Sequence, residues 1–318
     1  ENYASGDVAT TTDYDYGTGI YLLHSAVARG KQALDFDTSV DIQSLNIFDG
    51  SADQLLNATF SLKNDVEFLA AWDENYGTNE VATTTDYDYG TGIYLLHSAV
   101  ARGKQALDFD TTVDIQSLNI FDGSVDQLLN ATFNMKTDVE FLAAWDENYA
   151  SGDVATTTDY DYGTGVYLLH SAVARGKQAL DFDTSVDIQS LNIFDGSPDQ
   201  LLSATFGLKS DVEFLAAWDE NYASGDVATT TDYDYGTGIY LLHSAVARGK
   251  QALDFDTSVD IQSLNIFDGS ADQLLNATFS LKNDVEFLAA WDENYGTNEV
   301  ATTTDYDYGT GIYLLHSA

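Results

Sequence analysis

The chain is built from one sequence that is repeated with a fixed period of 73 residues. The opening segment ENYASGDVATTTDYDYGTG returns unchanged at Glu147 and Glu220, and as ENYGTNEVATTTDYDYGTG at Glu74 and Glu293. Each unit of such an array buries its apolar face against its neighbours, so the repeats are the natural divisions of the chain. We therefore divide it into 1–73 (repeat 1), 74–146 (repeat 2), 147–219 (repeat 3), 220–292 (repeat 4) and 293–318 (partial repeat 5). We expect a longer array of which this chain is a window.

Two-residue alternation of apolar and polar side chains runs through most of each unit and indicates β-strands. One such run extends from Leu34 to Ile42, and a second places Leu56, Phe60 and Phe68 on one face. We expect an all-β fold in which the tandem 73-residue repeats form a continuous elongated array, either β-solenoid-like or a stacked β-sheet. The alternative is a string of small β-sandwiches arranged as beads.

Two short segments of each repeat also carry patterns typical of helix starts. SADQ at residues 51–54 places a serine cap three positions before a glutamine, and NDVE at residues 64–67 is a similar capping pattern. Short helices near 52–60 and 65–75 are therefore a minor alternative to strands. Pro198, which replaces Ala52 in the third copy, should lie in a turn because proline lacks the N–H that a central strand uses.

The charge of the chain excludes several classes of protein. It has 12 Lys and Arg residues against 52 Asp and Glu residues, a net charge of −40, which rules out nucleic acid as a partner. The absence of cysteine excludes disulfides and thiolate metal sites. The longest nearly apolar run, residues 20–28, is too short to span a bilayer, so we expect no membrane insertion.

The densest carboxylates fall in the segments DYDYG and LDFDT of each repeat. Alternate residues of a strand point to one side, so each D-x-D pair should place two carboxylates about 7 Å apart on one face. Calcium, which takes six to eight oxygen ligands, would relieve their repulsion, and a solvated acidic face is the alternative. The predicted Ca²⁺ ligands are Asp13, Asp15, Asp35, Asp37, Asp86, Asp88, Asp108, Asp110, Asp159, Asp161, Asp181, Asp183, Asp232, Asp234, Asp254 and Asp256.

Two further surface features recur. Arg29 and Lys31 form a basic turn that could contact the acidic face of a neighbouring chain, although a charged turn that blunts a hairpin explains them as well. N-x-T sequons at Asn57, Asn130 and Asn276 are candidate glycosylation sites, although such triplets also arise by chance.

Nothing in the sequence indicates an enzyme. His24 recurs once per repeat without a second histidine or a cysteine nearby, so we expect a partly buried strand residue and no catalytic residues.

We expect the chain to be the structural repeat region of a secreted or cell-surface filament, sheath or fibrillar adhesin. Its partners would be copies of itself, and its assembly would depend on cations or salt. The alternatives are a multivalent module that binds a surface or glycan and an intracellular scaffold of a halophile.

Overall fold

The computed structural model describes most of the chain as strands and turns. It describes every residue except 1–3, 5, 7, 34, 35, 37, 38, 67, 73, 110, 183, 256, 286, 292, 309–313, 315 and 318. The described residues contain no α-helix, and therefore no helix that could span a membrane. The chain divides into two compact units, residues 1–157 and 158–318.

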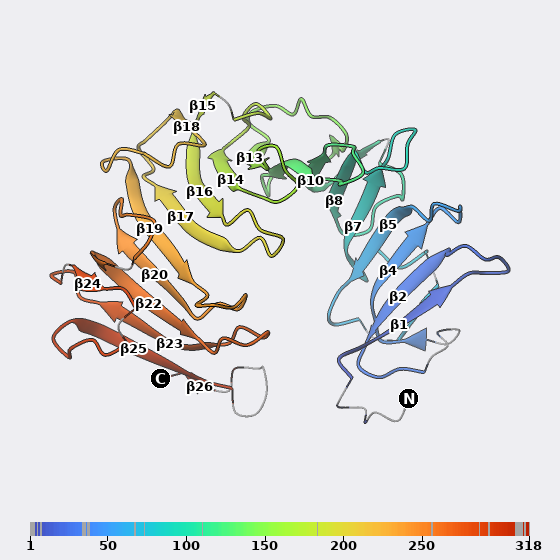
Figure 1. Cartoon of the computed structure of the whole chain (residues 1–318). Coiled ribbons are helices and arrows are strands. Elements are labelled where there is room, and N and C mark those ends of the chain that lie inside the picture. Colours follow the sequence, from blue (N-terminus) through green and yellow to red (C-terminus); the bar gives the residue numbers. More distant parts are fainter. Residues whose placement is uncertain are drawn as a thin grey trace. The chain divides into compact units, whose positions relative to one another are not determined.

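The first unit contains an antiparallel meander with four long strands per repeat (Figure 1). Each strand pairs with the next along the meander. In order, the strands are β1 (Thr10–Asp15), β2 (His24–Arg29), β4 (Ile42–Phe48), β5 (Leu56–Leu62), β7 (Val81–Asp88), β8 (His97–Arg102), β10 (Ile115–Phe121) and β11 (Leu129–Met135).

The second unit repeats this arrangement with the same antiparallel pairing. Its strands are β14 (His170–Arg175), β16 (Ile188–Phe194), β17 (Leu202–Leu208), β19 (Val227–Asp234), β20 (His243–Arg248), β22 (Ile261–Phe267), β23 (Leu275–Leu281), β25 (Val300–Asp307) and β26 (His316–Ser317). The strand β13 (Val154–Asp161) includes the boundary between the units.

Successive repeats are joined by the ladder itself. The last long strand of one repeat pairs with the first of the next in β5–β7, β17–β19 and β23–β25. The all-β repeat array expected from the sequence is therefore confirmed, and within each unit it is a continuous stacked sheet, not a string of separate sandwiches. Every neighbouring pair is antiparallel, as in a hairpin-connected meander.

A second layer covers one face of this sheet. The segments after β2 and β5 leave the sheet, and in each full repeat two residues from each segment pair as a small two-stranded antiparallel sheet. These small strands are β3 (Ser39–Val40) with β6 (Leu69–Ala70), β9 (Thr112–Val113) with β12 (Leu142–Ala143), β15 (Ser185–Val186) with β18 (Leu215–Ala216), and β21 (Ser258–Val259) with β24 (Leu288–Ala289).

The core lies between the sheet and this cover. In the first core cluster, Leu45 and Phe60 from the sheet are buried together with Phe36 from the covering segment and Tyr76 from the start of the second repeat. Tyr76 meets the Phe60 ring edge-on, with 5.9 Å between centroids, and its hydroxyl donates to the Ala71 carbonyl at 2.8 Å. Large aromatic side chains thus attach the cover to the sheet in every full repeat.

The helix alternative is wrong for the described residues of both segments. At residues 51–54 the cap-like side chains close a turn: the Asp49 carboxylate accepts from the amides of Ser51 and Leu55, at 3.0 and 3.1 Å. Gln54 then adopts φ = 51°, which ends any helical path, and β5 starts at Leu56. Pro198 lies in the equivalent turn, as expected.

The structure differs from the sequence-based prediction in the length of one strand, because β5 ends earlier than the alternating pattern indicated. Phe68 was expected to continue the buried face of β5, but the chain turns after Leu62. Phe68 is 62 % exposed and adopts φ = 57°, and the three equivalent phenylalanines do the same. Strand β5 therefore ends at Leu62, and the covering segment follows it.

Candidate functional site: the repeat junction

At the junction between the first two repeats, polar side chains lie together on β7, on the side of the sheet that the covering layer packs against. Asp86 and Asp88 lie on the core-facing side of β7 and line an open pocket of about 290 Å³. The same pocket is lined by Asp108, by Trp145 from the end of the repeat, and by Asn57 from the preceding repeat. Tyr87 and Leu107 complete the lining. The pocket therefore needs two successive repeats.

Asp86 is the most constrained of these carboxylates. It is only 7 % exposed, and its two oxygens accept from the amides of Tyr87 and Phe109, each at 3.0 Å. The second bond fixes the covering segment to the sheet. Burial is the main reason that the pKa of Asp86 is raised, to about 6; the nearby charges of Asp108 and Asp88 also raise it, while the two hydrogen bonds lower it. Asp159 and Asp232 in the next repeats have the same contacts and the same raised pKa of about 6.

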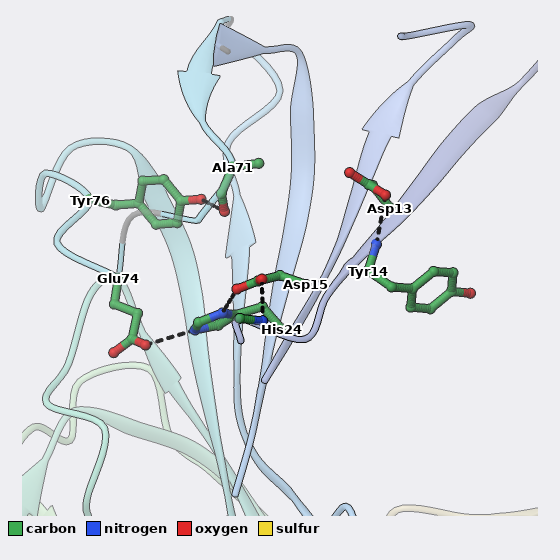
Figure 2. Close-up of polar contacts among 8 residues, drawn as sticks. Asp13, Tyr14, Asp15, His24, Ala71, Glu74 and Tyr76 are labelled. Atoms are coloured by element: carbon green, nitrogen blue, oxygen red, sulfur yellow. Dashed lines mark hydrogen bonds and ion pairs between the residues drawn. The ribbon is translucent and has the colours of Figure 1, made fainter. Parts of the chain in front are cut away.

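The second aspartate of the D-x-D pair belongs to a bridge between repeats. In the first copy, His24 Nδ1 lies 3.0 Å from Asp15 Oδ2, and Nε2 lies 2.9 Å from Glu74 Oε1, so one imidazole joins two carboxylates (Figure 2). The Trp72 ring packs against the imidazole at 6.2 Å. Glu74 is the first residue of the following repeat. Both ring nitrogens can donate to carboxylates at the same time only when the imidazole is protonated.

The bridge recurs with little change in geometry. His97, His170 and His243 each contact an aspartate and the glutamate that opens the next repeat, at 2.9 and 3.1 Å. The sequence correctly indicated a partly buried strand histidine. It did not reveal the glutamate, which lies 50 residues further along the chain. The repeat gave no signal for this pair, because every pair of residues in a tandem repeat recurs at a constant offset.

The basic turn is engaged within the chain. Arg29 pairs with Asp41 at 2.5 Å and donates to the carbonyls of Val66 and Lys63 at 3.3 Å. Lys104, the counterpart of Lys31, donates to two carbonyls at the start of its own repeat and lies 5.6 Å from the centroid of the Phe60 ring. These contacts fasten the cover and the junction. Lateral contact with another chain through Arg29 and Lys31 stays a prediction.

The other predicted sites are placed as follows. Asn57, Asn130 and Asn276 are exposed on β5, β11 and β23, so glycosylation stays a prediction. Among the residues that the structure describes, no group of three or more His, Cys, Asp or Glu side chains could hold a metal ion. Calcium binding also stays a prediction, since several expected ligands lie outside the described residues: Asp35, Asp37, Asp110, Asp183 and Asp256.

Comparisons with known proteins do not place the chain in a family. No known protein family matches it, and no curated protein matches it significantly. Among solved structures it has a weak likeness to the crystal structure of TcdB2-TccC3-TEV, at 13 % identity and a TM-score of 0.20. That alignment covers 94 % of this chain and 18 % of the other, so the chain spans about a fifth of that protein.

Proposed function

We propose that the chain is the repeat region of a secreted or cell-surface filament, sheath or fibrillar adhesin, in which the repeats provide mechanical span and self-association. The inter-repeat ladder supports this most directly: β5–β7, β17–β19 and β23–β25 pair in one common register. A sheet that is continued by each added repeat gains a whole interface per repeat, so length itself adds stability.

The junction side chains support the same function. His24 contacts Glu74 of the next repeat, Asp86 accepts from the Phe109 amide of the covering segment, and Lys104 donates to the Tyr76 carbonyl. These polar groups thus bind to one another within the chain. No buried side-chain N or O atom among the described residues lacks a hydrogen-bond partner. Polar groups used in this way indicate a structural role.

The proposal is tested with proteins of two, four and six repeats. Because neighbours stabilise one another, the urea midpoint of unfolding should rise with repeat number, steeply at first and then less. Electron microscopy of the same samples should show filaments whose formation depends on salt. The proposal would be contradicted if the unfolding midpoint did not depend on the number of repeats and electron microscopy showed only single particles.

A second candidate function is multivalent binding of a surface glycan. The observation that favours it is the junction pocket, which combines the Trp145 side chain with the carboxylates of Asp86 and Asp88 and the amide of Asn57. The tryptophan and both aspartates recur in every full repeat of the sequence. Weak sites on a regular array gain avidity through multivalency. A glycan array probed with the whole chain tests it, and Trp145→Ala with its three counterparts changed together should abolish any signal that depends on the pocket.

A further inference from the structure

The sheet has two faces, and the covering layer packs against one of them. Side chains alternate along a strand, so the residues between buried core positions point to the opposite face, which we call the outer face. On β8, Ala99 and Ala101 are buried in the core, whereas Val100 between them is partly exposed. On β10, Phe121 is partly exposed next to the buried Ile120. The outer face is thus in contact with solvent.

The outer face of the described strands carries no carboxylate, although the net charge of the chain is −40. In the second repeat its positions are threonine, serine, asparagine, tyrosine, valine and phenylalanine, apart from Arg102 at the end of β8, which pairs with an aspartate. The carboxylates of β7, Asp86 and Asp88, point to the core side. Other carboxylates, such as those of Asp108 and Glu140, are exposed on the covering layer. The negative charge therefore lies on the covered side and in the loops.

A row of polar side chains crosses the outer face in every full repeat. In the first repeat, Asn46 donates to Ser25 Oγ at 3.0 Å and accepts from Thr59 Oγ1 at 2.9 Å. These residues lie opposite one another on β2, β4 and β5. The Tyr87 hydroxyl, 3.4 Å from Thr59 Oγ1, continues the row into the next repeat. The Ser–Asn–Thr contacts recur in the other three full repeats at 3.1 and 2.9 Å.

The charge and the hydrogen bonds of the outer face indicate what covers it. Two copies that approach through their covering layers bring exposed carboxylates together, which costs free energy, whereas two outer faces meet without this repulsion. A neutral glycan would also avoid repulsion, but its binding needs donors and acceptors that point away from the sheet. The amide of Asn46 instead bonds along the sheet to Ser25 and Thr59, so the row can be buried with fewer unpaired polar groups. These observations favour another sheet over a glycan.

The area of the outer face is sufficient for a stable interface. The first unit contains eight long strands, from β1 to β11. With neighbouring strands about 4.8 Å apart and each about 20 Å long, their outer face covers roughly 770 Å². A standard protein interface buries about 800 Å² on each partner. Tyr87, Val100 and Phe121 supply apolar surface to this face, so one unit alone offers an interface of ordinary size.

We propose that the outer face packs against the outer face of a second copy of the chain, as two sheets about 10 Å apart. This inference rests on the proposed self-association and names the surface through which it takes place. Because the same face meets itself, the contact is isologous, and each further pair of repeats adds the same contacts. The exposed carboxylates of both copies remain on the two sides that face away from the interface.

The test compares the association of the whole chain with that of two charged variants. Sedimentation equilibrium in about 0.5 M NaCl measures the dissociation constant with long-range repulsion screened. The face variant carries one carboxylate per full repeat at partly exposed outer-face serines: Ser44→Glu, Ser117→Glu, Ser190→Glu and Ser263→Glu. We expect its dissociation constant to rise at least about tenfold, because the interface then buries like charges.

The matched control adds the same four charges to the exposed β4–β5 turn and its counterparts. It carries Ala52→Glu, Val125→Glu, Pro198→Glu and Ala271→Glu, at a position where the repeats already differ. This variant should associate as the unchanged chain does. Circular dichroism checks that both variants are folded.

Cysteines at the same positions give a second measurement that needs no added charge. The chain has no cysteine of its own, so Ser44→Cys, Ser117→Cys, Ser190→Cys and Ser263→Cys place thiols on the outer face alone. A bismaleimide that spans about 15 Å should join two copies across a sheet separation of about 10 Å. Cysteines at the four turn positions should give little cross-linked dimer.

The possible failures are distinguishable. If the chain associates but the face variant associates equally well, or if both cysteine sets cross-link equally, the outer-face interface is rejected and self-association stands. A chain that stays monomeric in this buffer would overturn self-association as well. Retention of that monomer by an insoluble neutral polysaccharide, abolished in the face variant, would overturn the proposal in favour of a glycan.

Discussion

At the scale of single residues, the buried aspartates set how the fold responds to pH. Asp86, Asp159 and Asp232 each accept two backbone amides and lose most of their contact with water. Their pKa values rise to about 6, mainly because burial disfavours the charged form. The hydrogen bonds that fix the cover therefore involve carboxylates that change charge close to neutral pH.

The sign of the resulting pH dependence follows from linkage. The folded-state pKa lies above the ordinary value of 3.8, so between about pH 4 and pH 6 the folded chain binds more protons than the unfolded chain. The free energy of unfolding should therefore rise as the pH falls from 7.5 to about 5, and the contribution of these groups is lost as the pH rises through 6. Urea unfolding across this range measures it.

The matched variant carries Asp86→Asn, Asp159→Asn and Asp232→Asn. Its histidines are unchanged, so the difference between the two pH profiles reports the three aspartates. We expect the variant to be less stable at every pH, because an amide cannot accept both backbone bonds, and to show a flatter profile between pH 5 and 7. Parallel profiles would show that these aspartates do not titrate in this range.

The sequence predicted part of this residue-level arrangement. Strand alternation correctly placed Asp86 and Asp88 on one side, because the side-chain period of a strand is two. The amide of Phe109 and the carboxylate of Glu147 could not be assigned as partners, since they come from segments that only the tertiary fold brings near. The burial that raises the pKa is likewise a property of the cover and not of the strand.

At the scale of elements, the junction is a strand pair reinforced by a side-chain bridge. The ladder β5–β7 connects the repeats through the backbone, while His97 connects β8 to Glu147 at the start of the next repeat. The alternation in the sequence predicted the strand from Leu56 to Leu62. It did not predict that the chain leaves the sheet between β5 and β7, where the two residues of β6 pair with β3 in the cover.

The bridge can be removed with little change in packing by His97→Phe. The phenyl ring retains the contact with Trp145, now 6.0 Å from the imidazole centroid, but loses both carboxylate contacts. Because the bridge is partly exposed to solvent, we expect a loss of about 1 to 2 kcal/mol in the free energy of unfolding. Urea unfolding at pH 7 measures the loss.

Glu147→Gln is the matched control for the inter-repeat half of the bridge. It removes one charge and keeps a hydrogen-bonding side chain, so its cost should be smaller, about 0.5 to 1 kcal/mol. If His97→Phe and Glu147→Gln both left the unfolding midpoint unchanged, the bridge would not contribute to the coupling of repeats.

At the scale of the whole chain, the charge is distributed by the repeat. Each full copy carries 12 acidic and three basic residues, and the total is −40. Each of the four arginines at the ends of β2, β8, β14 and β20 pairs with an aspartate, and Lys104 and Lys250 donate to backbone carbonyls. These few cations leave most of the acidic excess uncompensated. Like charges on a regular array repel at distances that salt controls.

Monovalent salt should therefore stabilise the chain. Raising NaCl from about 0.01 M to about 1 M shortens the screening length from about 30 Å to about 3 Å, so we expect the melting temperature to rise by several degrees. Four exposed acidic residues in the β4–β5 turn and its counterparts provide the matched variant: Asp53→Asn, Asp126→Asn, Asp199→Asn and Asp272→Asn. This variant should melt higher at low salt and gain less from added NaCl. A melting temperature insensitive to salt in both proteins would show that repulsion does not limit stability.

Calcium binding is tested separately, at fixed ionic strength. If calcium binds, about 1 mM CaCl₂ should raise the melting temperature further and EDTA should reverse the rise, which screening alone would not do.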